Sequence, residues 1–257
     1  MMLKRIIAIA RFTVVESFRH NMLLLLLSVT LLGYFAGLFA GTLSITESQQ
    51  AQQAVTAALF RLGLIFIIVL CVISSVAKEY NDKCIDVMLS VVDNRAEYYF
   101  GKLLGFFAIA LVFIVAFTLL VSFISDGYQA LIWGMSLAME AVIVIAFSIL
   151  CVLTFPQIPL SMFLVMAFYF LSRAIGAIVL MLDGPLADTT VLSQKLMVLF
   201  IEGISYLLPD LDSFTRTEWL VYQSGELSII APLFMQSVLY TLFISACALF
   251  DLYRKSV

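Results

Sequence analysis

Charged side chains are scarce in this chain of 257 residues. Asp, Glu, Lys and Arg together make up 12% of it, whereas 63% of the residues are hydrophobic. In soluble domains about a quarter of the residues are charged, so the composition excludes an ordinary soluble fold. We therefore expect the chain to fold in a lipid bilayer.

Residues that commonly carry out chemistry are also few. The one histidine, His20, excludes a bis-histidine site and an HExxH zinc motif. Four cysteines, Cys71, Cys84, Cys151 and Cys247, lie far apart without CxxC spacing, which indicates inert thiols. The phosphate-binding pattern GxxxxGK followed by Ser or Thr is absent as well. We expect no catalytic residue in this chain, and no metal or cofactor bound by it.

Six stretches are long and apolar enough to cross a bilayer, for which a helix needs about 20 residues. They are residues 21–41, 57–77, 103–125, 131–155, 160–182 and 229–250. The predicted fold is all-α, a single polytopic membrane domain over residues 1–257 with six transmembrane helices. Residues 183–228 are predicted to form an outer segment, in which 191–208 is a re-entrant or surface-lying helix.

Basic residues are distributed unevenly between the two sides of this topology. Six crossings leave only Arg61, Lys195 and Arg216 on one side, and nearly all other Lys and Arg residues on the other. Cytoplasmic loops carry the excess of basic residues, so both termini are predicted in the cytoplasm and the chain in the plasma membrane, the bacterial inner membrane. No basic face supports binding to nucleic acid.

Residues 3–19 have the spacing of an amphipathic helix. Such a helix is predicted to lie flat in the inner interface, with its basic side toward the lipid headgroups; an extended cytoplasmic flank is the alternative. The basic sector contains Lys4, Arg5, Arg11 and Arg19.

Small residues recur every fourth position in the first predicted span. Gly33, Gly37 and Gly41 would leave a groove that lets a second helix approach closely. Both self-association and packing within the chain use this device, and the sequence alone leaves the two open.

Two ionisable residues lie well inside predicted spans. Glu140 and Arg173 are each nine residues from the outer end of their span, about 14 Å at 1.5 Å per residue. Because an unpaired charge at that depth is costly, we predict an ion pair that faces the bundle interior. It would serve either as a structural link between neighbouring helices or as a substrate contact or proton relay.

A dense cluster of charges of both signs begins with residues 78–90, between the second and third spans. Its apolar positions have helical spacing, which predicts a short amphipathic helix at the inner surface that docks in a groove of a partner; a self-packed loop is the alternative. The residues concerned are Glu79, Asp82, Lys83, Ile85, Asp86, Met88 and Leu89.

This stretch and its continuation carry a family resemblance. Glu79, the run IDVMLS at 85–90, and the later Arg95, Glu97-Tyr98 and GKLLG at 101–105 resemble the first inner loop of type-2 ABC transporter permeases. The chain differs in having Cys84 at the usual Thr position and valines at 91–92 where proline is common. Residues 16–19 and 207–211 are similar to further family segments, so the resemblance extends over nearly the whole chain.

The resemblance implies a non-catalytic half-transporter that works as an exporter. Two such permeases would pair, as a homodimer or heterodimer, mainly through their first and fifth spans. Each would dock a separate ATPase subunit, which binds ATP and Mg, through the coupling helix at 78–90. The apolar composition favours a lipid, a drug-like molecule or an amphiphilic peptide as substrate. The alternatives are a stand-alone secondary transporter or channel that uses Glu140 and Arg173, an intramembrane enzyme and a membrane anchor.

Overall fold

The computed structural model describes residues 2–19, 22–44, 47–82, 95–182 and 203–254 apart from 206, together with 199 and 201. Within these ranges all regular elements are helices, as predicted. They are α1 (Met2–Arg19), α2 (Met22–Leu43), α3 (Ser48–Asn81), α5 (Arg95–Ser122), α6 (Gly127–Thr154), α7 (Ile158–Leu182), α9 (Thr217–Tyr222) and α10 (Leu227–Arg254).

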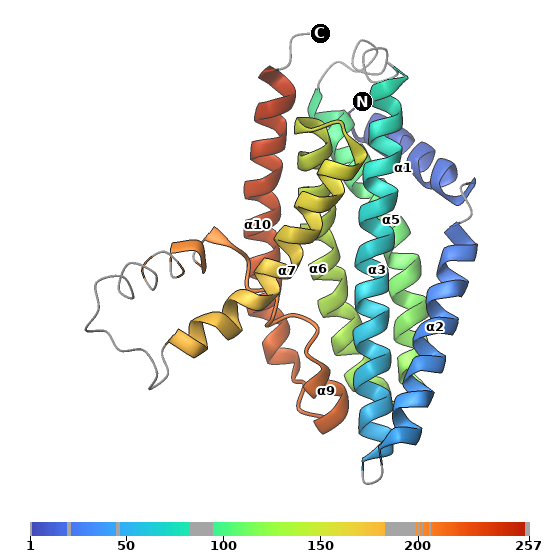
Figure 1. Ribbon diagram of the computed structural model, residues 1–257. Coiled ribbons are helices and arrows are strands. Elements are labelled where there is room, and N and C mark those ends of the chain that lie inside the picture. The colour runs from blue at the N-terminus through green and yellow to red at the C-terminus, as the bar shows by residue number, and fades with distance from the viewer. Residues whose placement is uncertain are drawn as a thin grey trace.

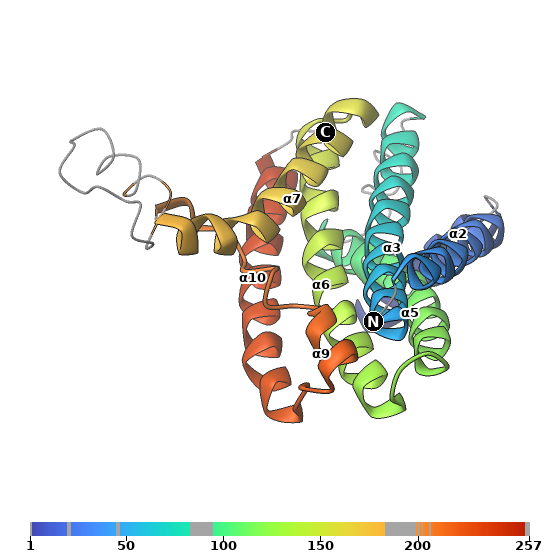
Figure 2. The ribbon, with the colours of Figure 1, turned by 60° about the horizontal axis from the view of Figure 1, so that its bottom comes forward.

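Six of these helices are long and apolar enough to cross a membrane: α2, α3, α5, α6, α7 and α10. Helix α6 is central, since it contacts α3, α5, α7, α9 and α10, and both ribbon views place it inside the bundle (Figures 1 and 2). Its position explains why it is buried on nearly every side, including at its one acidic residue, Glu140.

Proline sets the boundary between α6 and α7. Phe155, which precedes Pro156, adopts an extended backbone and ends α6, because the proline ring disfavours the helical conformation of the residue before it. Pro159 lies in the first turn of α7, where its missing N–H costs no helical hydrogen bond. The short connection leaves α6 and α7 packed against each other.

Helices α3 and α5 are longer than the predicted spans. Helix α3 begins at Ser48 and ends at Asn81, instead of covering only 57–77, and α5 begins at Arg95 rather than 103. The polar start of α3 packs within the bundle, since Gln53 donates a hydrogen bond of 2.8 Å to the carbonyl of Ile124. Hydropathy therefore marked the apolar centre of each helix and missed its polar ends.

The glycine row of α2 faces α3. A Cβ at Gly33 would lie 2.6 Å from the ring of Phe60, and a Cβ at Gly37 would lie 1.9 Å from the hydroxyl oxygen of Thr56. Gly41 is similarly close to the backbone of Ser48. Of the two alternatives that the sequence left open, the glycines serve packing within the chain, and no groove for a second copy remains on that face.

Helix α1 lies across the end of the bundle where α3 ends and α5 begins, which is also the end that the C-terminal turn of α10 reaches (Figure 1). It packs on α5, where the missing side chain of Gly105 gives room to Thr13. Its outward side carries apolar residues, since Ile7, Phe12 and Val15 are each more than half exposed, and its orientation toward the lipid headgroups stays a prediction. One residue of the predicted basic sector, Arg5, lies 3.8 Å from Glu97 of α5.

Candidate functional site

The structure contains a buried polar network halfway along the bundle, here called the central cluster: Arg61, Ser136, Glu140, Arg173 and Thr215. Glu140 has no exposed surface, and its Oε1 lies 3.6 Å from Nη1 of Arg173. The structure thus brings together the two residues that the sequence paired, on the adjacent helices α6 and α7. Burial of a charge requires such a partner.

Arg61 is a member of this cluster that sequence reasoning missed. The sequence counted it among the basic residues of the outer side because it lies only four residues inside the predicted span at 57–77, but α3 begins at Ser48, so Arg61 lies well inside this helix. Its Nη1 donates a hydrogen bond of 3.2 Å to the carbonyl of Thr215, and it interacts electrostatically with both Arg173 and Glu140. Two arginines therefore share the centre of the bundle with one glutamate.

Thr215 belongs to the connection between Leu208 and α9, and it lies within the central cluster. Its hydroxyl donates to Oε2 of Glu140 at 2.7 Å, and its backbone N–H donates to the hydroxyl of Ser136 at 2.9 Å. Arg173 donates to the carbonyl of Leu211 at 3.0 Å and, at 3.5 Å, to the hydroxyl of Thr215. Three helices thus hold one threonine through side-chain hydrogen bonds.

This geometry corrects the prediction of a polar outer connection at 210–228. Leu211, Phe214 and Thr215 have no exposed surface, so this part of the connection folds into the bundle. The signal in the sequence was the pair of large apolar residues, Leu211 and Phe214, directly after the helix-ending Pro209. Such residues in a polar stretch indicate burial.

Thr215 also has an unusual backbone. Its φ of 46° lies in the left-handed region, which a β-branched residue rarely adopts. Strain of this kind costs on the order of 1–3 kcal/mol and persists only where the surroundings fix the conformation. Here the four hydrogen-bonding side chains of the central cluster fix it.

The same connection is held at both of its ends. At its start, the hydroxyl of Tyr240 on α10 donates to the carbonyl of Leu208 at 2.9 Å. Beyond α9, the amide of Gln129 on α6 donates to the carbonyls of Gln223 and Gly225 and accepts from the N–H of Gly225 at 3.1 Å. These bonds satisfy backbone groups that would be costly to bury unpaired.

A second polar network, here called the junction cluster, lies where α1, α3 and α5 meet: Arg5, Glu79, Glu97, Tyr98 and Lys102. Lys102 donates to Oε1 of Glu79, and the hydroxyl of Tyr98 donates to Oε2 of the same carboxylate at 2.8 Å. Lys102 has no exposed surface and Glu79 is 6% exposed. The Glu79–Lys102 pair thus joins the end of α3 to the start of α5.

The junction cluster changes the interpretation of Glu79. The sequence placed this residue on a docking surface, but its carboxylate faces inward and is bonded to Lys102 and Tyr98. Helix α3 continues to Asn81, past the predicted start of the coupling helix at 78. Charge was taken as a sign of exposure, whereas a charge with an opposite partner and a hydroxyl donor can be buried.

Helix α1 is attached to the same region. Arg5 lies near the buried Glu97, as described above, and Sγ of Cys71 lies 3.6 Å from the hydroxyl oxygen of Ser17. The first links α1 to α5 and the second links it to α3. Helices α3 and α5, which precede and follow residues 83–94, are thus joined to each other and to α1.

Most of the predicted coupling helix lies outside the described residues, namely Lys83, Ile85, Asp86, Met88 and Leu89. Asp82 is described, and it is exposed at the C-terminal end of α3. Its role in docking stays a prediction. Residues 183–198 of the predicted outer segment also lie outside the described part, so the re-entrant helix stays a prediction too.

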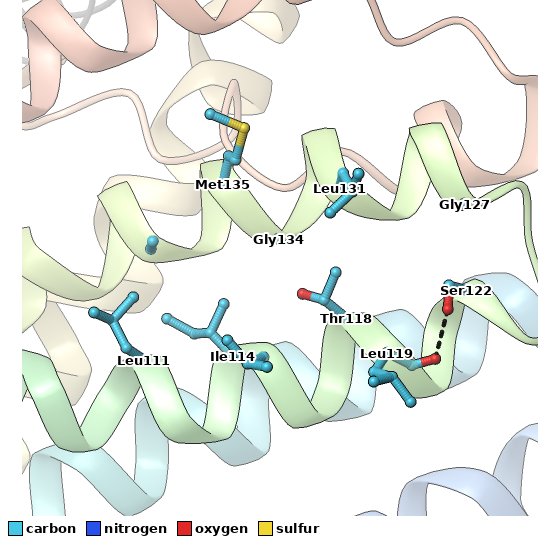
Figure 3. Close-up of a pocket in the computed structure, with 11 residues that line it drawn as sticks. Leu111, Ile114, Thr118, Leu119, Ser122, Gly127, Leu131, Gly134 and Met135 are labelled. Atoms are coloured by element: carbon cyan, nitrogen blue, oxygen red, sulfur yellow. Dashed lines mark hydrogen bonds between the residues drawn. The ribbon is translucent and has the colours of Figure 1, made fainter.

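An apolar cleft of about 570 Å³ lies between α5 and α6. Figure 3 shows Leu111, Ile114 and Thr118 of α5 pointing toward α6, with Leu131 and Gly134 opposite them. Its polar atoms are few: the hydroxyl of Ser122 donates to the carbonyl of Leu119 in its own helix at 2.7 Å, and that of Thr118 has no hydrogen-bond partner among the described residues. The cleft therefore suits a hydrocarbon chain.

Within the described ranges, no group of three or more His, Cys, Asp or Glu residues is placed to hold a metal ion. No protein-family model matches the sequence, and no curated protein matches it either. The class that the fold defines is an all-helical protein with six potential membrane crossings, typical of a multi-pass membrane protein. Assignment to a family rests on the motif resemblance alone.

Proposed function

We propose that this chain is the membrane-spanning permease subunit of an ATP-driven ABC exporter. It forms the translocation path and couples to a separate ATPase subunit through residues 78–90. The observation that carries the proposal is the junction cluster, because two residues of the family-like motif, Tyr98 and Lys102, both donate to the carboxylate of a third, Glu79, at the base of that loop.

This network connects the proposed docking loop mechanically to the helices on either side of it. A force on the loop reaches α3 and α5 together, since the two helices are joined by a buried ion pair. Removing one partner of such a pair costs about 3–5 kcal/mol, so the joint resists separation. The chain has no phosphate-binding motif of its own, and in this proposal ATP and Mg belong to the partner.

A second copy of the permease completes the proposed transporter. Helices α2 and α7, the first and fifth spans, expose large apolar side chains such as Phe35, Phe39, Phe163 and Phe170. These faces are available to lipid or to a second copy. The glycine row is not part of this proposed interface, because it is occupied by α3.

Copurification tests the docking proposal. The full chain is coexpressed with a candidate ABC ATPase subunit from the same source, and two substitutions are made in the loop, Asp82→Lys and Met88→Asp. Both are expected to abolish copurification. Glu218→Lys is the matched control, because Glu218 is exposed on α9, and it should leave copurification unchanged.

Retention of the ATPase by both loop variants would contradict the proposal. So would loss of the ATPase in the Glu218→Lys control together with them, since that pattern indicates general misfolding rather than a docking surface. The Asp82 variant is the stronger of the two, because the position of this residue is described.

A second candidate function is a stand-alone secondary transporter or channel. The observation that favours it is the complete burial of Glu140 beside two arginines, a setting typical of ion and proton pathways. Purified chain in vesicles without ATPase distinguishes the two. The exporter proposal expects no substrate or ion flux under these conditions, whereas flux that is lost in Glu140→Gln would favour the second candidate.

A further inference from the structure

We propose that the central cluster is a binding site for the head of an anionic amphiphile, and that Thr215 occupies this site in the present conformation. The ligand class is an amphiphile whose head carries one phosphodiester and one hydrogen-bond donor, a hydroxyl or an amine. Such a ligand would displace the threonine and take over its hydrogen bonds.

The hydrogen bonds of Thr215 define what a replacement must offer. Its carbonyl accepts from Arg61, and its hydroxyl accepts from Arg173 while donating to Glu140. Its N–H donates to Ser136. A ligand in this place needs acceptor oxygens toward the two guanidinium groups and a donor toward the carboxylate.

The charges of the site define the charge that the ligand must carry. Arg61 and Arg173 face one buried carboxylate, that of Glu140, which leaves one positive charge in excess. Asp212 also interacts with Arg61, but it is exposed, and solvent weakens such interactions. Nε of Arg61 is buried without a hydrogen-bond partner among the described residues. A neutral threonine cannot balance the excess charge.

A phosphodiester fits these requirements. It carries one negative charge and two free oxygens, and guanidinium groups bind such oxygens through short, charge-assisted hydrogen bonds. The carboxylate of Glu140 would repel an anion that had no donor, so the head must also present a hydroxyl or an amine. The apolar surroundings of the bundle suit the remaining acyl part.

Two features of the structure favour the departure of Thr215 from the central cluster. Its left-handed backbone is strained, and that strain is released when the connection moves away. The site is not sealed, because the side chain of Arg173 is 18% exposed. The threonine therefore resembles a ligand supplied by the chain itself, held by the same groups that would hold an external one.

Trp219, four residues after Thr215 and 4% exposed, is a natural reporter of this movement. The full chain is purified in detergent with Trp133→Phe, which leaves Trp219 as its one tryptophan. Lysophosphatidylglycerol, which has both a phosphodiester and hydroxyls, is compared with dodecylphosphocholine, whose phosphodiester head has no hydroxyl or N–H donor, and with monoacylglycerol, which lacks the phosphate. We expect a saturable change in emission with the first, at an affinity at least tenfold higher than for the others.

Two substitutions separate a ligand site from a structural network. Thr215→Val keeps the shape but removes the hydroxyl that competes with the ligand, so it should bind lysophosphatidylglycerol about tenfold more tightly. Arg61→Met should bind it at least tenfold more weakly. Arg216→Met is the matched control, because Arg216 is exposed in the same connection, and its affinity should equal that of the unaltered chain.

Equal affinity for the three lipids, or no gain in affinity in Thr215→Val, would overturn the proposal. If Trp133→Phe or Arg61→Met fails to fold, binding of radiolabelled lysophosphatidylglycerol to the otherwise unaltered chain and to Arg61→Lys gives the same decision, with weaker binding expected for the lysine. No ATPase is present in this experiment, so its failure would leave the docking proposal standing.

Discussion

The two buried clusters use similar residues in different ways. In the junction cluster, a lysine and a tyrosine from one helix saturate a glutamate from another, and the Glu79–Lys102 pair at its centre balances in charge. In the central cluster, two arginines and a glutamate hold the backbone and hydroxyl of a strained connection, and one positive charge remains. The first network joins helices to each other, whereas the second holds Thr215, the residue that we propose a ligand replaces.

The largest expected effect comes from removing one partner of the balanced pair. Lys102→Met would leave the buried carboxylate of Glu79 without its cation, and the free energy of unfolding should fall by about 3–5 kcal/mol. Unfolding by titration with sodium dodecyl sulfate measures this change in detergent-purified chain.

The control for this variant is Lys78→Met, since Lys78 is exposed one position before Glu79. It should change the stability by less than about 0.5 kcal/mol. The double variant Glu79→Gln with Lys102→Met should recover much of the loss, because no buried charge is left. A Lys102→Met protein as stable as the unaltered chain would show that the pair does not fix the helices.

A smaller effect is expected from the corresponding change at the centre. Glu140→Gln keeps the size of the side chain but leaves Arg61 and Arg173 without their carboxylate. Arg173 retains the carbonyl of Leu211 and partial exposure, so we expect a loss of about 2 kcal/mol, measured in the same titration. A loss equal to that of Lys102→Met would remove the contrast between the clusters; Glu218→Gln, an exposed acid, is the control.

The smallest effect is expected at Ser136, which bonds the N–H of Thr215. Ser136→Ala should lower the overall stability by about 1 kcal/mol and speed the hydrogen exchange of the connection at 208–222 more than that of α6. Ser122→Ala is the matched control, since that hydroxyl bonds only within its own helix. Uniformly faster exchange throughout the bundle would instead assign Ser136 a general packing role.

Hydropathy and spacing were sufficient to predict the helical class, the six potential crossings and the Glu140–Arg173 pair. They failed at Arg61, at Glu79 with Lys102, and at Leu211 with Phe214. Hydropathy treats every charged residue as solvated and every polar stretch as a loop, although a charge can be buried when its partner is present. Such partners lie on other helices, far apart in sequence, and no local pattern reveals them.

Helix α3 belongs to both clusters, with Arg61 near its middle and Glu79 near its end. Its 34 residues correspond to about 51 Å at 1.5 Å per residue, well beyond the roughly 30 Å of a hydrocarbon core. Along a straight helix the two residues are separated by about 27 Å. A tilt of this one rod by a few degrees therefore displaces both networks at once, which makes the orientation of α3 the natural coordinate for any change of state in this protein.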